Sequence, residues 1–108
     1  MDSAFHALAD SNRRAIIELL GERARTVSEL LEHFDFTQPA LSKHLRLLRE
    51  AGLVTYEDDG RYRRYSLSGE ALGEVSAWLL RYRRFWNARL DALGQVLDAE
   101  AKKRKRAR

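Results

Sequence analysis

The sequence predicts a mainly α-helical domain that carries one small β-hairpin. Its 108 residues suffice for a single domain and leave no room for a second core. Apolar residues recur at helical spacing up to residue 51 and again from residue 69. Between them, residues 54–67 have the pattern of two strands around an Asp-Gly turn. We therefore expect one domain over residues 1–101, followed by a basic tail over residues 102–108.

Four helices are expected before the hairpin, over residues 3–9, 11–21, 27–34 and 38–51. Asp10 can cap the second helix, and Thr26 and Glu29 have the spacing of a capping box that opens the third. Pro39 lies in the first turn of the fourth helix, where no hydrogen-bonded donor is lost. Gly52 is placed to end that helix.

A hairpin and one long helix complete the domain. Strands over residues 54–57 and 62–67 flank Asp58-Asp59-Gly60, and an Asp-Gly pair favours a tight hairpin turn. From residue 69 to residue 101, apolar residues advance by three or four positions, which predicts one continuous helix. Its apolar stripe consists of Leu72, Val75, Leu79, Tyr82, Trp86, Leu90, Leu93 and Leu97.

The formal net charge of +4 is unevenly distributed. Residues 102–108 carry six of the 20 basic residues, and the rest of the chain has 14 basic and 16 acidic residues, a charge of −2. Nucleic-acid binding by the domain must therefore depend on local patches of charge. The tail is either a solvated end or a source of salt-dependent, sequence-independent DNA affinity.

Several classes of function are disfavoured by what the chain lacks. Without cysteine it has no disulfide, thiolate metal site or cysteine nucleophile, and His6, His33 and Asp35 lack the spacing of a ligand set. No nucleophile with a general base and no glycine-rich phosphate loop appear, so we expect no enzyme, no metal and no cofactor. With neither a signal peptide nor a membrane-spanning run, we expect a cytoplasmic protein without a membrane partner.

The faces left over by the expected core indicate DNA binding. If Leu41, Leu45 and Leu48 face inward, the opposite side of the fourth helix presents Gln38, Ser42, Lys43 and Arg46. Such a helix fits the major groove, and these side chains can bond to base edges or phosphates. The hairpin adds Arg61, Arg63 and Arg64, which suit phosphates or a narrow minor groove. This order of elements is that of a winged helix-turn-helix.

Three runs of sequence carry a family resemblance. They are residues 7–17 (ALADSNRRAII), residues 38–54 (QPALSKHLRLLREAGLV), and Gly60-Arg61 leading to residues 65–67. The chain resembles the ArsR/SmtB family of bacterial winged-helix repressors over residues 3–97. The resemblance implies a homodimer that binds an inverted-repeat operator in double-stranded DNA and releases it when an effector binds. It places base recognition at Gln38, Ala40, Ser42 and Lys43 and wing contacts at Gly60 and Arg61.

The chain departs from the metal-sensing members of that family. The third helix has no cysteine, and the last helix has Asp91 but no histidine, so neither of the family's metal sites can be assembled. The pattern from Trp78 to Leu93 is instead similar to a cysteine-free branch, often associated with neighbouring SRPBCC-type ligand-binding proteins. The effector, a small molecule or a protein, is not specified by the sequence.

Apolar residues of the first and last helices are expected to form the dimer interface. They are Phe5, Leu8, Trp78, Tyr82, Phe85, Trp86, Leu90 and Leu93. The aromatic residues among them suit a dimer core or a ligand pocket between helices. An alternative is a protein-interaction module that uses the aromatic helix and has only non-specific DNA affinity. Two smaller expectations are a packing or phosphate-binding role for His44 and an Arg49–Glu50 ion pair.

Overall fold

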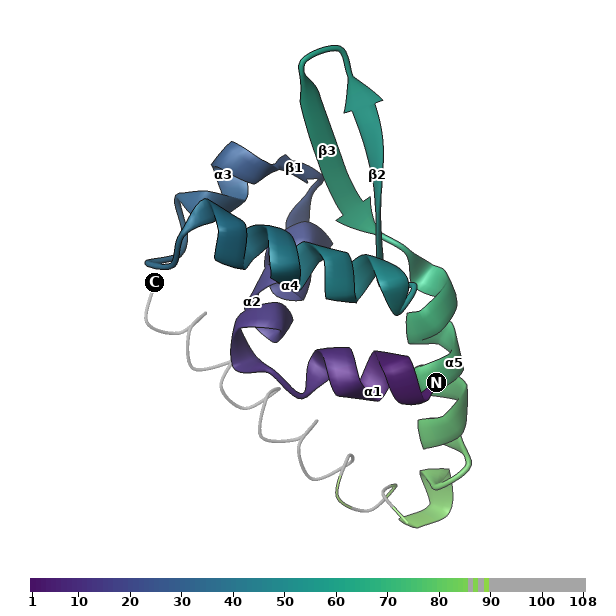
Figure 1. Ribbon diagram of the computed structural model, residues 1–108. Coiled ribbons are helices and arrows are strands. Elements are labelled where there is room, and N and C mark those ends of the chain that lie inside the picture. The colour runs from purple at the N-terminus through teal and green to yellow at the C-terminus, as the bar shows by residue number, and fades with distance from the viewer. Residues whose placement is uncertain (86, 88, 90–108) are drawn as a thin grey trace, which may run out of the picture. The chain divides into compact units, whose positions relative to one another are not determined.

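The computed structural model describes residues 1–85, 87 and 89 (Figure 1). Its internal contacts divide the chain into two compact units, Met1–Ser76 and Ala77–Arg108. The elements are α1 (Asp2–Leu8), α2 (Ser11–Glu22), β1 (Arg25–Thr26), α3 (Val27–Leu31), α4 (Gln38–Glu50), β2 (Val54–Asp59), β3 (Tyr62–Leu67) and α5 (Gly69–Leu80). The expected mainly helical fold with a hairpin wing is confirmed. None of the described helices is both long and apolar enough to cross a bilayer.

The wing is a three-stranded antiparallel sheet in the order β1-β3-β2, and its hairpin projects away from α2, α3 and α4 (Figure 1). The sequence indicated β2 and β3 but not β1, because two residues are too few to show an alternating pattern. In β1, Arg25 pairs with Tyr65 and Thr26 with Arg64. The short strand thus joins the start of α3 to the base of the hairpin.

The core of the first unit is made chiefly of leucine side chains from the helices and the start of the hairpin. Six large side chains are fully buried, namely Ile16, Leu30, Leu41, Leu45, Leu48 and Leu53. Three of them come from α4 at spacings of four and three residues, so one side of that helix is buried along its length. The packing therefore decides which side of α4 faces solvent.

Two buried arginines donate hydrogen bonds to carbonyls at the carboxyl ends of the first two helices. Arg13 donates from Nε to the carbonyl of Ala7 (2.7 Å) and from Nη2 to that of His6 (3.2 Å), at the end of α1. Arg25 donates from Nε to the carbonyl of Leu19 near the end of α2 (3.1 Å). The carbonyls of His6 and Leu19 also accept from the backbone amides of Ala9 and Arg23, and the arginines add charged donors that interact favourably with the helix dipole.

The last helix is shorter than its apolar periodicity predicted. Helix α5 ends at Leu80, and helical structure resumes at residues 83–85. In the turn between them, Arg81 N donates to Trp78 O (3.2 Å) and Tyr82 N to Leu79 O (3.1 Å). Each of these hydrogen bonds joins an amide to the carbonyl three residues earlier, as in a 3₁₀-helix, where a continuous α-helix was expected. The rest of the expected helix, including Trp86 and residues 90–101, and the basic tail lie outside the described residues.

We expect Arg13→Met to lower the free energy of unfolding by about 2–3 kcal/mol, because it leaves buried carbonyls without their charged donor. Arg14 is the matched control, since its exposed guanidinium also donates to an α1 carbonyl, that of Leu8 (2.8 Å). Arg14→Met should cost no more than about 1 kcal/mol. Urea unfolding followed by circular dichroism measures both, and equal losses would contradict the role assigned to burial.

Candidate nucleic-acid interface

Helix α4 begins at a side-chain cap and ends at a glycine. Thr37 Oγ1 accepts a hydrogen bond from Ala40 N (3.4 Å), and Pro39 occupies the first turn. After Ala51 the chain turns at Gly52, whose φ of +76° is strained for other residues. The boundaries expected from the sequence are therefore confirmed to within one residue.

The polar residues expected on the outer face of α4 are exposed. Gln38, Ser42, Lys43 and Arg46 all face solvent, and Ala40 is half-buried. Among the described residues, the side chains of the first three form no hydrogen bond or ion pair. Polar groups on this face are thus available to a ligand.

The expected Arg49–Glu50 ion pair is wrong. Glu50 instead faces Arg46, one helical turn before it, with Arg46 Nε 3.8 Å from Glu50 Oε1. Adjacent residues on a helix point in different directions, whereas residues four apart share a face. The guanidinium of Arg49 lies over the ring of Tyr56 in β2, 5.2 Å from its centroid.

The three arginines of the wing have different surroundings. Arg61 follows Gly60 (φ +65°) at the hairpin turn, is exposed, and has no ion-pair partner in the described part of the chain. Arg63 lies 3.5 Å from Asp58 and is 52% exposed. Arg64 faces Asp59 and Glu29, at 3.7 Å from each. Arg61 is therefore the cation of the wing that is freest to meet a phosphate.

The surroundings of His44 favour a packing role. Its ring is tilted against that of Phe36, with centroids 5.3 Å apart. Its Nδ1 atom is buried and has no hydrogen-bond partner among the described residues. Because Nδ1 does not reach solvent, this ring nitrogen cannot donate to a phosphate.

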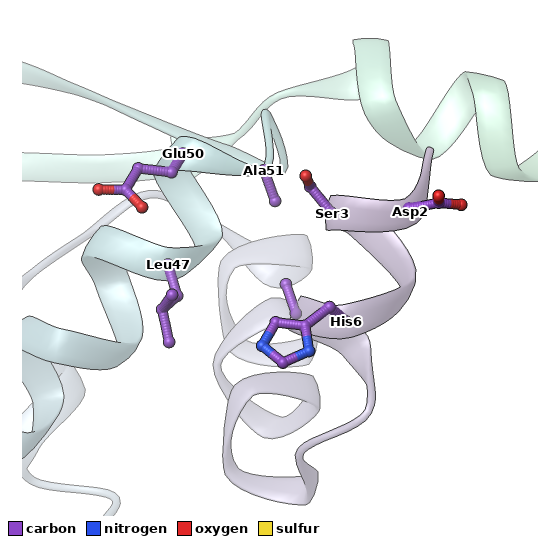
Figure 2. Close-up of a pocket in the computed structure, with 7 residues that line it drawn as sticks. Asp2, Ser3, His6, Leu47, Glu50 and Ala51 are labelled. Atoms are coloured by element: carbon purple, nitrogen blue, oxygen red, sulfur yellow. The ribbon is translucent and has the colours of Figure 1, made fainter.

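A cavity of about 330 Å³ lies between α1 and the carboxyl end of α4 (Figure 2). In Figure 2 the ring of His6 points toward Leu47, while the carboxylates of Asp2 and Glu50 point away from the space. No group of three potential ligands that could hold a metal ion occurs among the described residues. The cavity is thus a small, mostly apolar recess with one imidazole in its wall.

The residues expected at a dimer interface are partly exposed in each unit. In the first unit Phe5 is exposed and Leu8 is half-buried. In the second unit Trp78 packs edge-on against Tyr82, with ring centroids 5.3 Å apart, and Phe85 is 70% exposed. Leu80, which the sequence did not single out, is also exposed. Trp86, Leu90 and Leu93 lie outside the described residues.

A helix with a leucine-lined inner side and polar outer side, next to a hairpin with a cationic tip, defines a winged helix-turn-helix DNA-binding protein. The profile of bacterial regulatory proteins of the arsR family matches residues 10–56. The chain belongs to this family of DNA-binding transcriptional regulators.

Named relatives and solved structures agree with this assignment. HTH-type transcriptional regulator Rv2034 of Mycobacterium tuberculosis is 37% identical over 92% of this chain and 90% of its own length. Transcriptional repressor SdpR of Bacillus subtilis is 32% identical over 76% of this chain and 91% of its own length. The crystal structure of the ArsR family regulator RHA00566 covers 80% of this chain and 89% of its own, with a TM-score of 0.72 and 35% identity.

The fold is also that of a homodimeric protein from Mycobacterium bovis. The solution structure of its winged helix-turn-helix DNA-binding domain, Mb0332, covers 77% of each chain with a TM-score of 0.63. At 24% identity this likeness shows the fold alone.

Glu29 links the start of α3 to the wing. It forms the expected capping box with Thr26, and its carboxylate also faces Arg64 of β3. The hydrogen bond from Arg23 Nη1 (2.7 Å), together with those from Thr26, lowers the pKa of Glu29 to about 2 from an ordinary 4.5. Ionised Glu29 therefore stabilises the fold above pH 4.5, and this contribution is lost as the pH falls toward 2.

We expect Glu29→Gln to lower the thermal midpoint at pH 7, and this deficit to shrink between about pH 4.5 and pH 2. The neutral amide cannot replace the ionised partner of Arg23, whereas at low pH the wild-type carboxyl is also neutral. Circular dichroism melts at several pH values test this. Glu32→Gln is the control, because the Glu32 side chain has no partner among the described residues. A deficit that stays constant down to pH 2 would count against the assignment.

Proposed function

We propose that the protein is a sequence-specific transcriptional repressor that acts in the cytoplasm and binds an inverted-repeat operator as a homodimer. The observation that carries the proposal is the outer face of α4, which is polar, exposed and free of internal partners at three of its positions. When such a helix lies in the major groove, these side chains can bond to base edges without first giving up an internal partner.

In this proposal α4 reads the bases. Gln38 and Ser42 bond to base edges, and Lys43 and Arg46 bond to guanine or to phosphates. Ala40, half-buried at the edge of this face, contacts a thymine methyl group. The net charge of the domain is secondary, because a few well-placed cations are enough to fix the register of a helix on DNA.

The wing then holds the flanking DNA. Gly60 lets the chain turn at the tip, and Arg61 extends from it to a phosphate or into the minor groove. Arg63, half-exposed beside Asp58, makes a second backbone contact. The basic tail adds affinity that does not depend on sequence and weakens with salt.

A homodimer would place two copies of α4 about 34 Å apart, or a multiple of that, to match an inverted repeat. The exposed apolar side chains of Phe5 in α1 and of Leu80, Tyr82 and Phe85 support this. We assign the interface to Phe5, Leu8, Trp78, Tyr82, Phe85, Trp86, Leu90 and Leu93. A small molecule or protein that binds the same aromatic segment would act as the effector.

The first test is a titration of the full chain into its own upstream promoter fragment and into a shuffled duplex. Binding is measured by fluorescence anisotropy near physiological salt. A preference for the promoter of about 1,000-fold or more is expected of a specific repressor. Equal, strongly salt-dependent binding to both would favour the protein-interaction module, with the tail as the source of DNA affinity.

We expect Lys43→Ala to weaken operator binding by about 1–3 kcal/mol and to weaken binding to the shuffled duplex much less. The reason is that a base contact is lost only where the correct base is present. Arg14→Ala removes the same charge from α2, where the guanidinium bonds to the carbonyl of Leu8, and it should leave the discrimination between the two duplexes unchanged. An equal loss on both duplexes in Lys43→Ala would show that this lysine contacts only phosphate.

The dimer assignment is tested by Phe85→Glu, which puts a charge on the most exposed of the described large apolar side chains. We expect sedimentation equilibrium to show a dimer for the wild type and at least tenfold weaker dimerisation for the variant, because burying the charge without a partner is costly. Tyr62→Glu, at an exposed aromatic of the wing, should leave the dimer intact. A variant as dimeric as the wild type would remove Phe85 from the interface.

A further inference from the structure

The outer half of the wing has little support from the sheet. Strand β1 pairs only with Tyr65 and Arg64 of β3, and beyond these residues β2 and β3 pair only with each other. A two-stranded hairpin is marginally stable in water. The direction in which the wing tip points must therefore be fixed by side chains.

Tyr56 lies where α4 meets the wing and contacts both. The guanidinium of Arg49, in the last turn of α4, lies 5.2 Å from the ring centroid, and that of Arg63 in β3 lies 4.5 Å from it. The ring of Tyr65, buried at the base of the sheet, is 5.5 Å away on the same side of the hairpin. Tyr56 thus joins a helix, two strands and the core.

The contacts continue from Tyr56 toward the tip. Arg63 stands directly opposite Asp58 in the strand register, with its Nε 3.5 Å from the carboxylate. The hydrogen bond with Tyr65, together with the charge interaction with Tyr56, raises the pKa of Arg63. At the other end, the side chain of Arg49 has Tyr56 as its only partner among the described residues. A continuous chain of contacts runs from the end of α4 to within two residues of Arg61.

We infer that Tyr56 is a positioning residue whose ring, in contact with the guanidinium groups of Arg49 and Arg63, fixes the wing relative to α4. The inference rests on the proposed function in one respect, namely that α4 and Arg61 contact the same DNA. Cation–π contacts give each arginine a preferred place without using all of its donors, so both remain able to bond to phosphates.

Backbone relaxation of the free protein tests the coupling without DNA. Tyr56→Leu keeps an apolar side chain but removes the ring, and Tyr56→Phe keeps the ring and removes only the hydroxyl. Amide order parameters for residues 57–63 should stay at about 0.85 in the wild type and in Tyr56→Phe, and fall to about 0.6 in Tyr56→Leu. Equal order in all three proteins, or equal loss in both variants, overturns the inference.

Arg49→Gln tests the same contact from α4. It leaves Tyr56 in place, so the inference stays testable even if Tyr56→Leu misfolds. It should loosen the wing as Tyr56→Leu does, because it removes one of the two guanidinium groups. Arg46→Gln is the matched control for wing order, since Arg46 lies one turn earlier on the same helix and faces Glu50. A wing as ordered in Arg49→Gln as in Arg46→Gln also overturns the inference.

Operator binding tests whether the coupling is used. In each background, the effect of Arg61→Ala is the ratio of the operator Kd with this substitution to the Kd without it. This ratio should be at least threefold smaller in the Tyr56→Leu background than in the wild type, and unchanged in the Tyr56→Phe background. The loss caused by Lys43→Ala should be the same in all backgrounds, because buried leucines still hold α4. An Arg61→Ala effect that is equal in every background overturns the use in DNA binding. Failure of the wild type to prefer its promoter would count against the proposed function, while the relaxation data still decide the role of Tyr56.

Discussion

Three buried leucines fix the direction of every functional group on α4. Neighbouring residues of an α-helix point about 100° apart, so burial of Leu41, Leu45 and Leu48 on one side sends Lys43 and Arg46 outward. Turning the helix by one residue would expose leucine and bury a cation, and each exchange costs about 2–5 kcal/mol. The polar face therefore needs no contact of its own to hold its orientation, and in the described part of the chain Gln38, Ser42 and Lys43 have no side-chain partner.

The arginines of this chain divide into groups with separate tasks, which the net charge does not reveal. Arg13 and Arg25 are buried and satisfy helix carbonyls, so they contribute to stability and not to a binding surface. Arg64 faces two carboxylates, Glu29 at the start of α3 and Asp59 beside the hairpin turn. Within the described residues Arg61 at the wing tip has no such partner, and Arg63 contacts both a tyrosine ring and a carboxylate. A domain with a body charge of −2 can thus still present cations where DNA would lie.

Local signals predicted most of the fold and the outer face of α4. The capping box of α3, Pro39 and the Asp-Gly turn act over a few residues, so the sequence alone places them. Features without a periodic or turn signal in the sequence were missed or misplaced. Strand β1 exists because β3 pairs with it, the carbonyl contacts of Arg13 and Arg25 leave no periodic pattern, and the turn at Arg81 interrupts a helix without Pro or Gly.

The two buried arginine contacts also bear on the order in which the domain assembles. Each guanidinium reaches a carbonyl six residues earlier in the chain, so closing these loops costs little conformational entropy. Strand β1, in contrast, must find a partner about 40 residues away. The corner between α1 and α2 and the end of α2 can form while the chain is still largely open. The β2–β3 hairpin also closes over a short turn, so the pairing of β1 with β3 is the step of sheet formation with the high entropic cost.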